Sequence, residues 1–365
     1  MNPKEKGDKA LAGLFKVCQP CVRGAHDSDF LLAKGKAYIV YMANDLQPGE
    51  HPDWPFMYDA LSVVDLASGE VIKTVIFAAS EKQYSNVTLP VGACFVPRIL
   101  QVNETTLRCF FASEEPGKRQ SQTWYLDYDL LAEEFIWTLH KAWIKTSQGT
   151  FPMQPMHFYQ QAVAEGFDYP HRNWGLYMID SFKRFDGRVW AVLNNFPGMQ
   201  NAWSVLNEEL NEFEVLGNYF RPQEHRLSES SVNRLPDGTW LAISRQQTGD
   251  LNYMFSRSPD GTSWSDNEYW PLIPNGTESK PTFDCFRGLY YLGWQEATSI
   301  NGVQRSVFNI EVSPNGVDWE RKYRFETEKT FQYPNFREYE GSIYLTVTQG
   351  DKERIMFGKL EDLSD

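Results

Sequence analysis

The sequence contains no hydrophobic run long enough to cross a bilayer, because a spanning helix needs roughly 18 consecutive apolar residues. Its first stretch, MNPKEKGDKALAGLFKVCQPC, also lacks the apolar core of a secretory signal. We therefore expect no membrane insertion. A cytoplasmic protein is expected from the sequence as it stands, and a periplasmic or secreted one if a signal peptide has been removed.

Basic residues are in deficit, with 35 Lys and Arg against 48 Asp and Glu and a formal net charge of −13. A nucleic-acid-binding surface needs clustered positive charge, so no nucleic-acid partner is expected. A local basic pocket can still form in such a chain.

Cysteine is also scarce, and its five copies are too few for a disulfide framework in a chain of this length. Cys18 and Cys21 form one Cys-x-x-Cys, but no second pair of cysteines or histidines follows at a zinc-binding spacing. Cys94, Cys109 and Cys285 lie in apolar runs and are expected to be buried. The sequence therefore predicts no metal and no cofactor.

Aromatic residues, by contrast, make up 15% of the chain, and one polar turn that ends in Trp occurs twice. The stretch SRSPDGTSWSD begins at Ser256, and EVSPNGVDWER begins at Glu311. Ser and Asp or Asn bond to their own backbone in turns, and Gly supplies a positive φ. The repeated pattern is typical of a hairpin tip with Trp264 or Trp319 packed beneath it.

Hairpin turns followed by aromatic or alternating strands occur six times along the sequence. The residues just after these turns are spaced 50 to 82 positions apart, and they are Ala37, Leu107, Val189, Thr239, Leu289 and Ser342. A period near fifty predicts an all-β, six-bladed β-propeller with four-stranded antiparallel blades. One propeller domain is expected over residues 26–365 after a lead-in of residues 1–25, with insertions near 44–59 and 151–175. The second insertion contains the best helical segment, YQQAVAEGF.

The two turns with the pattern Ser-x-Asp/Asn-Gly-x-x-Trp resemble the Asp-box of the sialidase superfamily, which is also built from BNR repeats on a six-bladed propeller. The resemblance covers roughly residues 26 to 360. It implies a carbohydrate-active enzyme, an exo-acting glycoside hydrolase that removes a terminal acidic sugar from an oligosaccharide. The expected partner is this acidic oligosaccharide, and a monomer is expected.

The resemblance also implies roles for particular residues at the starts and ends of the inner strands. Tyr333 is similar to the family's nucleophilic Tyr, and Glu229 is similar to the Glu that accepts its phenolic proton. Arg245 and Arg305 correspond to arginines that grip a carboxylate, because a guanidinium binds a carboxylate through two parallel hydrogen bonds.

The first repeat departs from the family pattern. Sialidases open it with an Arg beside Ile-Pro, whereas this chain has HDSDF, and Arg98 follows one repeat later. This difference weakens the case for sialic acid itself, so the expected terminal sugar is either a uronic acid or a nonulosonic acid. It leaves His26, Asp27 and Asp29 as candidates for the general acid. The remaining candidate substrate-binding residues lie in strand-end loops or insertions: Arg119, Lys280, His171 and His225.

Two other functions fit the same scaffold. A lyase that acts on a uronic acid by β-elimination needs a base and a neutraliser of the carboxylate. Candidates for these roles cluster in or beside loops: His157, Tyr159, His171, Arg172, His225 and Arg226. The other alternative is a carbohydrate-binding propeller without catalysis, in which aromatic side chains stack on sugar rings.

Overall fold

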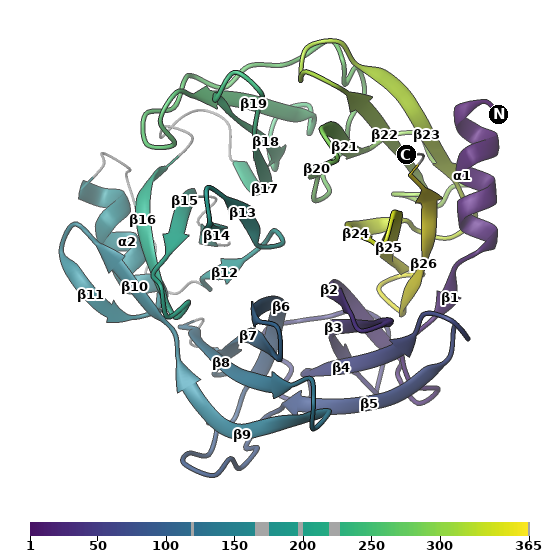
Figure 1. Cartoon of the computed structure of the whole chain (residues 1–365). Helices are drawn as coiled ribbons and strands as arrows, with labels where there is room; N and C mark the ends of the chain where they lie inside the picture. Colours follow the sequence, from purple (N-terminus) through teal and green to yellow (C-terminus); the bar gives the residue numbers. More distant parts are fainter. Residues whose placement is uncertain (118–119, 165–174, 196–199, 219–226, 364–365) are drawn as a thin grey trace.

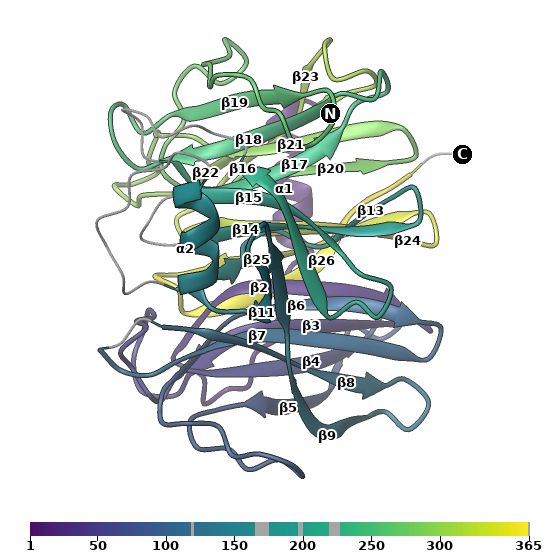
Figure 2. The same ribbon diagram turned by 90° about the vertical axis from the view of Figure 1, so that its left-hand side faces the viewer.

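The computed structural model describes residues 1–117, 120–164, 175–195, 200–218 and 227–363. Their strands form sheets arrayed around a central axis, as Figure 1 shows. In the side view of Figure 2, the strands of each sheet run from one end of the ring toward the other.

Four sheets have four antiparallel strands each. The first contains β2 (Gly24–Ala33), β3 (Lys36–Asn44), β4 (Tyr58–Asp65) and β5 (Val71–Ala78). The second contains β6 (Ala93–Asn103), β7 (Thr106–Glu114), β8 (Gln122–Asp129) and β9 (Glu134–Lys141). The third contains β20 (Thr282–Phe286), β21 (Leu289–Gln295), β22 (Val307–Ser313) and β23 (Glu320–Glu326). The fourth joins β24 (Gln332–Tyr339), β25 (Ser342–Gln349) and β26 (Arg354–Asp362) to β1 (Phe15–Lys16).

The other two sheets are irregular. One has only three strands, β17 (Leu227–Arg234), β18 (Trp240–Gln246) and β19 (Tyr253–Ser258). The other has seven, namely β11 (Gly149–Pro152), β10 (Trp143–Thr146), β16 (Glu212–Asn218), β15 (Gln200–Leu206), β14 (Arg188–Asn195), β12 (Tyr177–Met178) and β13 (Lys183–Phe185). In this larger sheet β10 pairs with β16 in parallel.

The predicted all-β fold with four-stranded antiparallel blades is confirmed, but the predicted count of six such blades is wrong. Five sheets are purely antiparallel blades of three or four strands, and the sixth is an enlarged mixed sheet. The insertion after β9 causes the enlargement, because it adds β10 and β11 to the outer edge instead of forming a loop. After β19 the chain carries Pro271, Pro274 and Pro281, and proline cannot donate to a sheet ladder. In the described residues, an isolated bridge from Glu268 to Phe255 lies beside β19 in place of a fourth strand.

Apolar side chains of neighbouring sheets pack face to face and form the core between them. The cluster of Leu61, Phe77, Phe111 and Leu126, for example, joins the first two four-stranded sheets and is fully buried. Cys94 and Cys109 belong to this cluster, as expected, whereas Cys285 is exposed. This packing holds adjacent sheets in a fixed relation, so the inner strands present a rigid ring of residues at each mouth.

Two helices lie on the outside of the ring (Figure 1). Helix α2 (Pro155–Ala164) lies in the second insertion, where a helix is expected from the sequence, and contacts β10. Helix α1 (Pro3–Ala12) packs on β23, and the sequence analysis missed it. The chain then continues into β1, whose Phe15 pairs with Phe357 of β26.

The two Asp-box-like turns have the local geometry that their residues predict. Ser258 Oγ accepts from the Gly261 amide at 2.8 Å, and Asp260 accepts from the amides of Thr262 and Ser263. The second turn repeats this pattern around Ser313 and Asn315. Ser258 pairs with Trp240 and Tyr253 pairs with Arg245, so the first turn lies at the opposite end of its sheet from Arg245.

Replacement of Trp264 by Ala is expected to lower the free energy of unfolding by about 3 to 5 kcal/mol, because it leaves a large cavity in the core. Trp264 is buried, and its indole N–H donates to the Gly261 carbonyl. Chemical denaturation measures the loss, with Trp319→Ala as a comparison, because Trp319 is only partly buried and should cost less. A Trp264→Ala protein of unchanged stability but lost activity would contradict the structural role.

Candidate active site

Irregular backbone at one end of the inner strands aims side chains toward the ring axis. The β2–β3, β6–β7 and β24–β25 ladders each shift register there, between His26 and Asp29, Phe95 and Arg98, and Gln332 and Asn335. Such bulges redirect a side chain and are common beside active sites. The bulges contain Asp27, Val96 and Tyr333, whose φ angles of 47°, 52° and 54° are costly for residues other than glycine. The three strands thus store strain at one mouth of the ring.

A cavity of about 230 Å³ lies at this mouth. Its walls come from every inner strand that carries a bulge and from the loops beside them. The lining residues are His26, Asp27, Met42, Glu50, Pro52, Phe95, Val96, Tyr177, Ile179, Asn194, Glu229, Arg245, Arg305, Tyr333 and Lys352. Apolar and ionisable groups therefore line the same cavity, which suits a small polar ligand with a partly apolar face.

Three of the sequence-predicted residues form one hydrogen-bonded group in this cavity. The hydroxyl of Tyr333 donates to Glu229 Oε1 and accepts from Arg245 Nη1 at 2.9 Å. Arg245 Nη1 also donates to Glu229 Oε2 at 2.5 Å. The three side chains come from β24, β17 and β18, so sheets distant in sequence bring them together.

The electrostatics of this group favour a neutral Tyr333 beside a negatively charged Glu229. Burial raises the pKa of Tyr333 well above the usual phenol value, and the negative charge of Glu229 raises it further. Burial also acts to raise the pKa of Glu229, but the Arg245 charge and the hydrogen bonds from Tyr333 and Arg245 outweigh it and lower that pKa. The resting site therefore holds a neutral phenol against a carboxylate that can accept its proton.

The candidates from the first repeat occupy different positions. His26 lines the cavity, its ring lies 4.3 Å from the ring of Tyr333, and its Nδ1 bonds to Thr348 Oγ1 at 3.0 Å. Burial, followed by the charges of Lys352 and Arg305, lowers the pKa of His26 well below its usual value, so the ring is neutral at pH 7. Asp27 also lines the cavity and accepts from Arg98 Nη2 at 2.9 Å.

Asp29 does not line the cavity and instead ties inner strands together. It accepts from Ser181 at 2.7 Å and from Arg337 at 3.1 Å. Arg98 is fully buried behind Asp27 and donates to the Ile179 carbonyl. Lys280 is also buried outside the lining, where Nζ lies 3.1 Å from Asn335 Oδ1 and 5.6 Å from the Tyr333 ring centre.

Arg305 lines the cavity, and its guanidinium has fewer hydrogen bonds and ion pairs with the protein than that of Arg245. Its Nη1 donates to Gln332 Oε1 at 3.1 Å, and its Nη2 lies 3.6 Å from Glu278. Glu278 also lies 3.6 Å from Arg245 Nη2, so one partly exposed carboxylate faces both guanidinium groups. The two arginines are thereby held beside each other at the edge of the cavity.

Several predicted residues lie outside the described part of the chain: Arg119, His171 and His225, together with Arg172 and Arg226 of the lyase alternative. His157 and Tyr159 are described and belong to α2. The His157 ring stacks on Phe151 at 4.3 Å, and neither residue lines the cavity.

An ion pair that no sequence pattern predicted lies on the cavity wall. Lys352 Nζ donates to Glu50 Oε1 at 2.6 Å, and both residues line the cavity. Burial raises the pKa of Glu50, although the Lys352 charge opposes this effect. Glu50 lies in the first insertion, whose polar composition was noticed, but nothing in its spacing pointed to this carboxylate.

A second feature that the sequence did not predict is the hydrogen-bonded pair of Tyr177 and Glu114, which lies beside the same cavity.

Among the described residues no group of three His, Cys, Asp or Glu side chains is placed to hold a metal ion. No helix in the described ranges is long and apolar enough to span a membrane.

Comparison with known proteins relates the chain to sialidases through structure alone. No protein-family model matches the sequence, and no curated protein matches it. A protein of unknown function from Dyadobacter fermentans is similar in structure, with a TM-score of 0.67, 11% identity, and coverage of 95% of this chain and 97% of that one. Trypanosoma rangeli sialidase in complex with sialic acid gives a TM-score of 0.61 at 10% identity, over 93% of this chain and 54% of that chain. NanB sialidase from Streptococcus pneumoniae gives 0.58 at 9% identity, over 96% and 70%.

Proposed function

The chain has a sialidase-like β-propeller fold, and from its site we propose that it is an exo-acting glycoside hydrolase that removes a terminal acidic sugar. The observation that carries the proposal is the Tyr333 hydroxyl, which is hydrogen-bonded to both the Glu229 carboxylate and the Arg245 guanidinium in the cavity. A structural role alone does not require a strained Tyr in contact with both groups. A buried phenol becomes a nucleophile when a carboxylate takes its proton.

The proposed reaction uses this arrangement in two steps. The Tyr333 oxygen attacks the anomeric carbon while Glu229 accepts the phenolic proton, and the glycosidic oxygen leaves with a proton from a general acid. Water then cleaves the sugar from Tyr333: its oxygen bonds to the anomeric carbon, its proton goes to the deprotonated general acid, and Glu229 returns the phenolic proton to the Tyr333 oxygen. Arg245 Nη1 lies 2.9 Å from that oxygen, where its charge can stabilise the negative charge that develops on it.

For the general acid we propose Glu50. Asp27 faces two cations, with Arg98 Nη2 at 2.9 Å and Lys280 Nζ at 3.7 Å, whereas Glu50 is paired with the single cation Lys352 among the described residues. His26 is neutral, and Asp29 lies outside the lining. Glu50 lines the cavity, and burial raises its pKa, which favours the protonated form that a general acid needs.

The acidic group of the sugar is assigned to Arg245 and Arg305, because both guanidinium groups line the cavity. Arg245→Lys keeps the charge but removes the planar fork, so we expect KM for an acidic substrate to rise about 10-fold to 100-fold. Steady-state kinetics measure the change, with Arg257→Lys as a control, because Arg257 lies over the Trp270 ring away from the cavity. Equal turnover of neutral and acidic sugars by the wild-type protein would contradict this assignment.

A panel of oligosaccharides capped with uronic or nonulosonic acids tests the proposed reaction. Mass spectrometry of the products should show the addition of water. An unsaturated product that absorbs near 230 nm would instead indicate β-elimination and overturn the hydrolase. Binding without any product would support the carbohydrate-binding alternative.

A further inference from the structure

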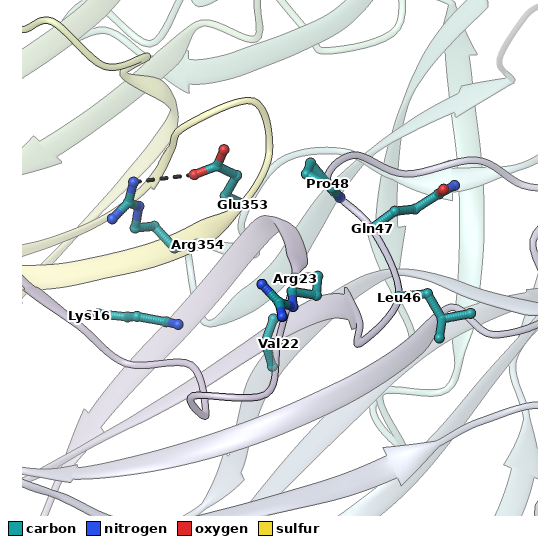
Figure 3. Close-up of a pocket in the computed structure, with 8 residues that line it drawn as sticks. All are labelled: Lys16, Val22, Arg23, Leu46, Gln47, Pro48, Glu353 and Arg354. Atoms are coloured by element: carbon teal, nitrogen blue, oxygen red, sulfur yellow. Dashed lines mark hydrogen bonds and ion pairs between the residues drawn. The ribbon is translucent and has the colours of Figure 1, made fainter.

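The structure has a second hollow, of about 460 Å³, whose lining residues are drawn in Figure 3. It is lined by Lys16, Val22, Arg23, Leu46, Gln47, Pro48, Glu353 and Arg354. These residues come from β1, from the chain just before β2, from the loop between β3 and β4, and from the β25–β26 turn and the start of β26. The hollow therefore lies between the first and the last sheet of the ring.

One ridge separates this hollow from the cavity. The ridge consists of the β3–β4 loop and the β25–β26 turn, which are joined by the Lys352 to Glu50 ion pair and by the hydrogen bond from the Gly49 amide to the Lys352 carbonyl. Glu50 and Lys352 face the cavity, whereas their near neighbours Pro48 and Glu353 line the hollow. A glycan chain whose terminal sugar occupies the cavity can cross the ridge into the hollow.

The charges in the hollow favour an anion. Lys16, Arg23 and Arg354 face a single carboxylate, Glu353, which is paired with Arg354 at 3.2 Å. Within the described residues, the side chains of Lys16 and Arg23 form no ion pair or hydrogen bond with the protein. Figure 3 shows their charged ends pointing toward each other. Two convergent cations repel each other until an anion lies between them, and they stand out in a chain with a net charge of −13.

The remaining lining residues suit a sugar better than a bare inorganic ion. Leu46 and Pro48 offer apolar surface, and Leu46 is 67% exposed, whereas Val22 is buried beneath the hollow. Gln47 supplies an amide that can bond to hydroxyl groups. A sugar acid presents an apolar ring face, hydroxyl groups and an anion, and the hollow offers a counterpart for each.

We infer that this hollow is a second subsite, which binds a further anionic sugar on the leaving-group side of the glycan. The inference rests on the proposed function, because it takes the cavity as the seat of the terminal sugar. It narrows the substrate class to glycans that carry at least two acidic sugars, rather than neutral chains with one acidic cap.

Binding measurements test the subsite independently of turnover. We would titrate acidic oligosaccharides by calorimetry into the full chain carrying Tyr333→Phe, so that hydrolysis does not consume them. The probes are trisaccharides of galacturonate and of sialate and a chondroitin tetrasaccharide, each compared with its acidic monosaccharide. At least one should bind about tenfold more tightly than its monosaccharide, and Lys16→Gln with Arg23→Gln should remove that gain.

The matched control is Lys9→Gln with Lys34→Gln, which changes the net charge equally at exposed positions in α1 and in the β2–β3 turn. It should retain the gain. Equal binding of oligosaccharide and monosaccharide across the panel, or an equal loss in the control, would overturn the subsite. Competition by inorganic sulfate as strong as that by the oligosaccharide would assign the hollow to a free oxyanion and also overturn it. If the wild-type protein hydrolyses nothing but the binding gain depends on Lys16 and Arg23, only the proposed function fails.

Discussion

Tyr333→Phe is expected to lower kcat by about 10³-fold or more while leaving substrate binding nearly unchanged. The substitution removes only the hydroxyl that contacts Glu229 and Arg245, and the ring can keep its place against His26. Because the lost interaction belongs to the transition state, KM or the affinity for product should change little. Steady-state kinetics and calorimetry with the released sugar measure the two effects separately.

Tyr344→Phe is the matched control for this result. Tyr344 lies in the neighbouring strand β25, and its ring stacks on Phe357 at 5.8 Å, away from the cavity. Its loss of a hydroxyl should leave kcat within about twofold of the wild type, as is usual for a change outside the site. If Tyr333→Phe retains more than a tenth of the wild-type rate, Tyr333 is not the nucleophile.

Glu229→Gln is expected to lower kcat by about 10²-fold to 10⁴-fold, because an amide cannot take the phenolic proton. The amide oxygen can still accept from Arg245, so the fold and the cavity should remain. Exposed Glu320→Gln is the control, since it removes a carboxylate on the outer strand β23. Equal rates for the wild type and Glu229→Gln would assign the base to another group.

The pH dependence follows from the lowered pKa of Glu229. The carboxylate is the active form, so activity is present above its pKa in the folded protein and is lost as the pH falls through that value. Since the Arg245 charge and the hydrogen bonds lower this pKa, the acid limb of kcat/KM should lie below the ordinary glutamate value of about 4.3. An acid limb near pH 6 that disappears in Glu229→Gln would contradict the proposed electrostatics.

The sequence predicted the local hairpins and part of the site. All six expected hairpin turns join paired strands, because glycine or asparagine turns followed by alternating strands act over a few residues. Tyr333, Glu229, Arg245 and Arg305 do converge on one cavity, and the resemblance to sialidases pointed to them. Their chemical roles remain predictions.

The features that the sequence analysis missed depend on long-range pairing. The parallel pairing of β10 with β16 joins segments about 70 residues apart, and no local pattern specifies it. The Glu50 to Lys352 pair joins residues at opposite ends of the chain.

Other features have local sequence signals. Helix α1 could have been predicted, since Asn2 and Glu5 form a capping box at its start. The bulges at Val96 and Tyr333 could also have been predicted, because a proline follows each of these residues. Proline cannot donate a hydrogen bond to the neighbouring strand, so it is common where the pairing of two strands is interrupted.

The pairing of β1 with β26 has a consequence for how the protein is made. Residues 15 and 16 emerge from the ribosome early, but their partners, Phe357 and Met356, are synthesised more than 300 residues later. The ring can close only when both are present, and the cavity requires His26 from the first sheet and Lys352 from the last. Individual sheets can form during synthesis, whereas the site comes into existence as a single late event, when the two ends of the ring meet.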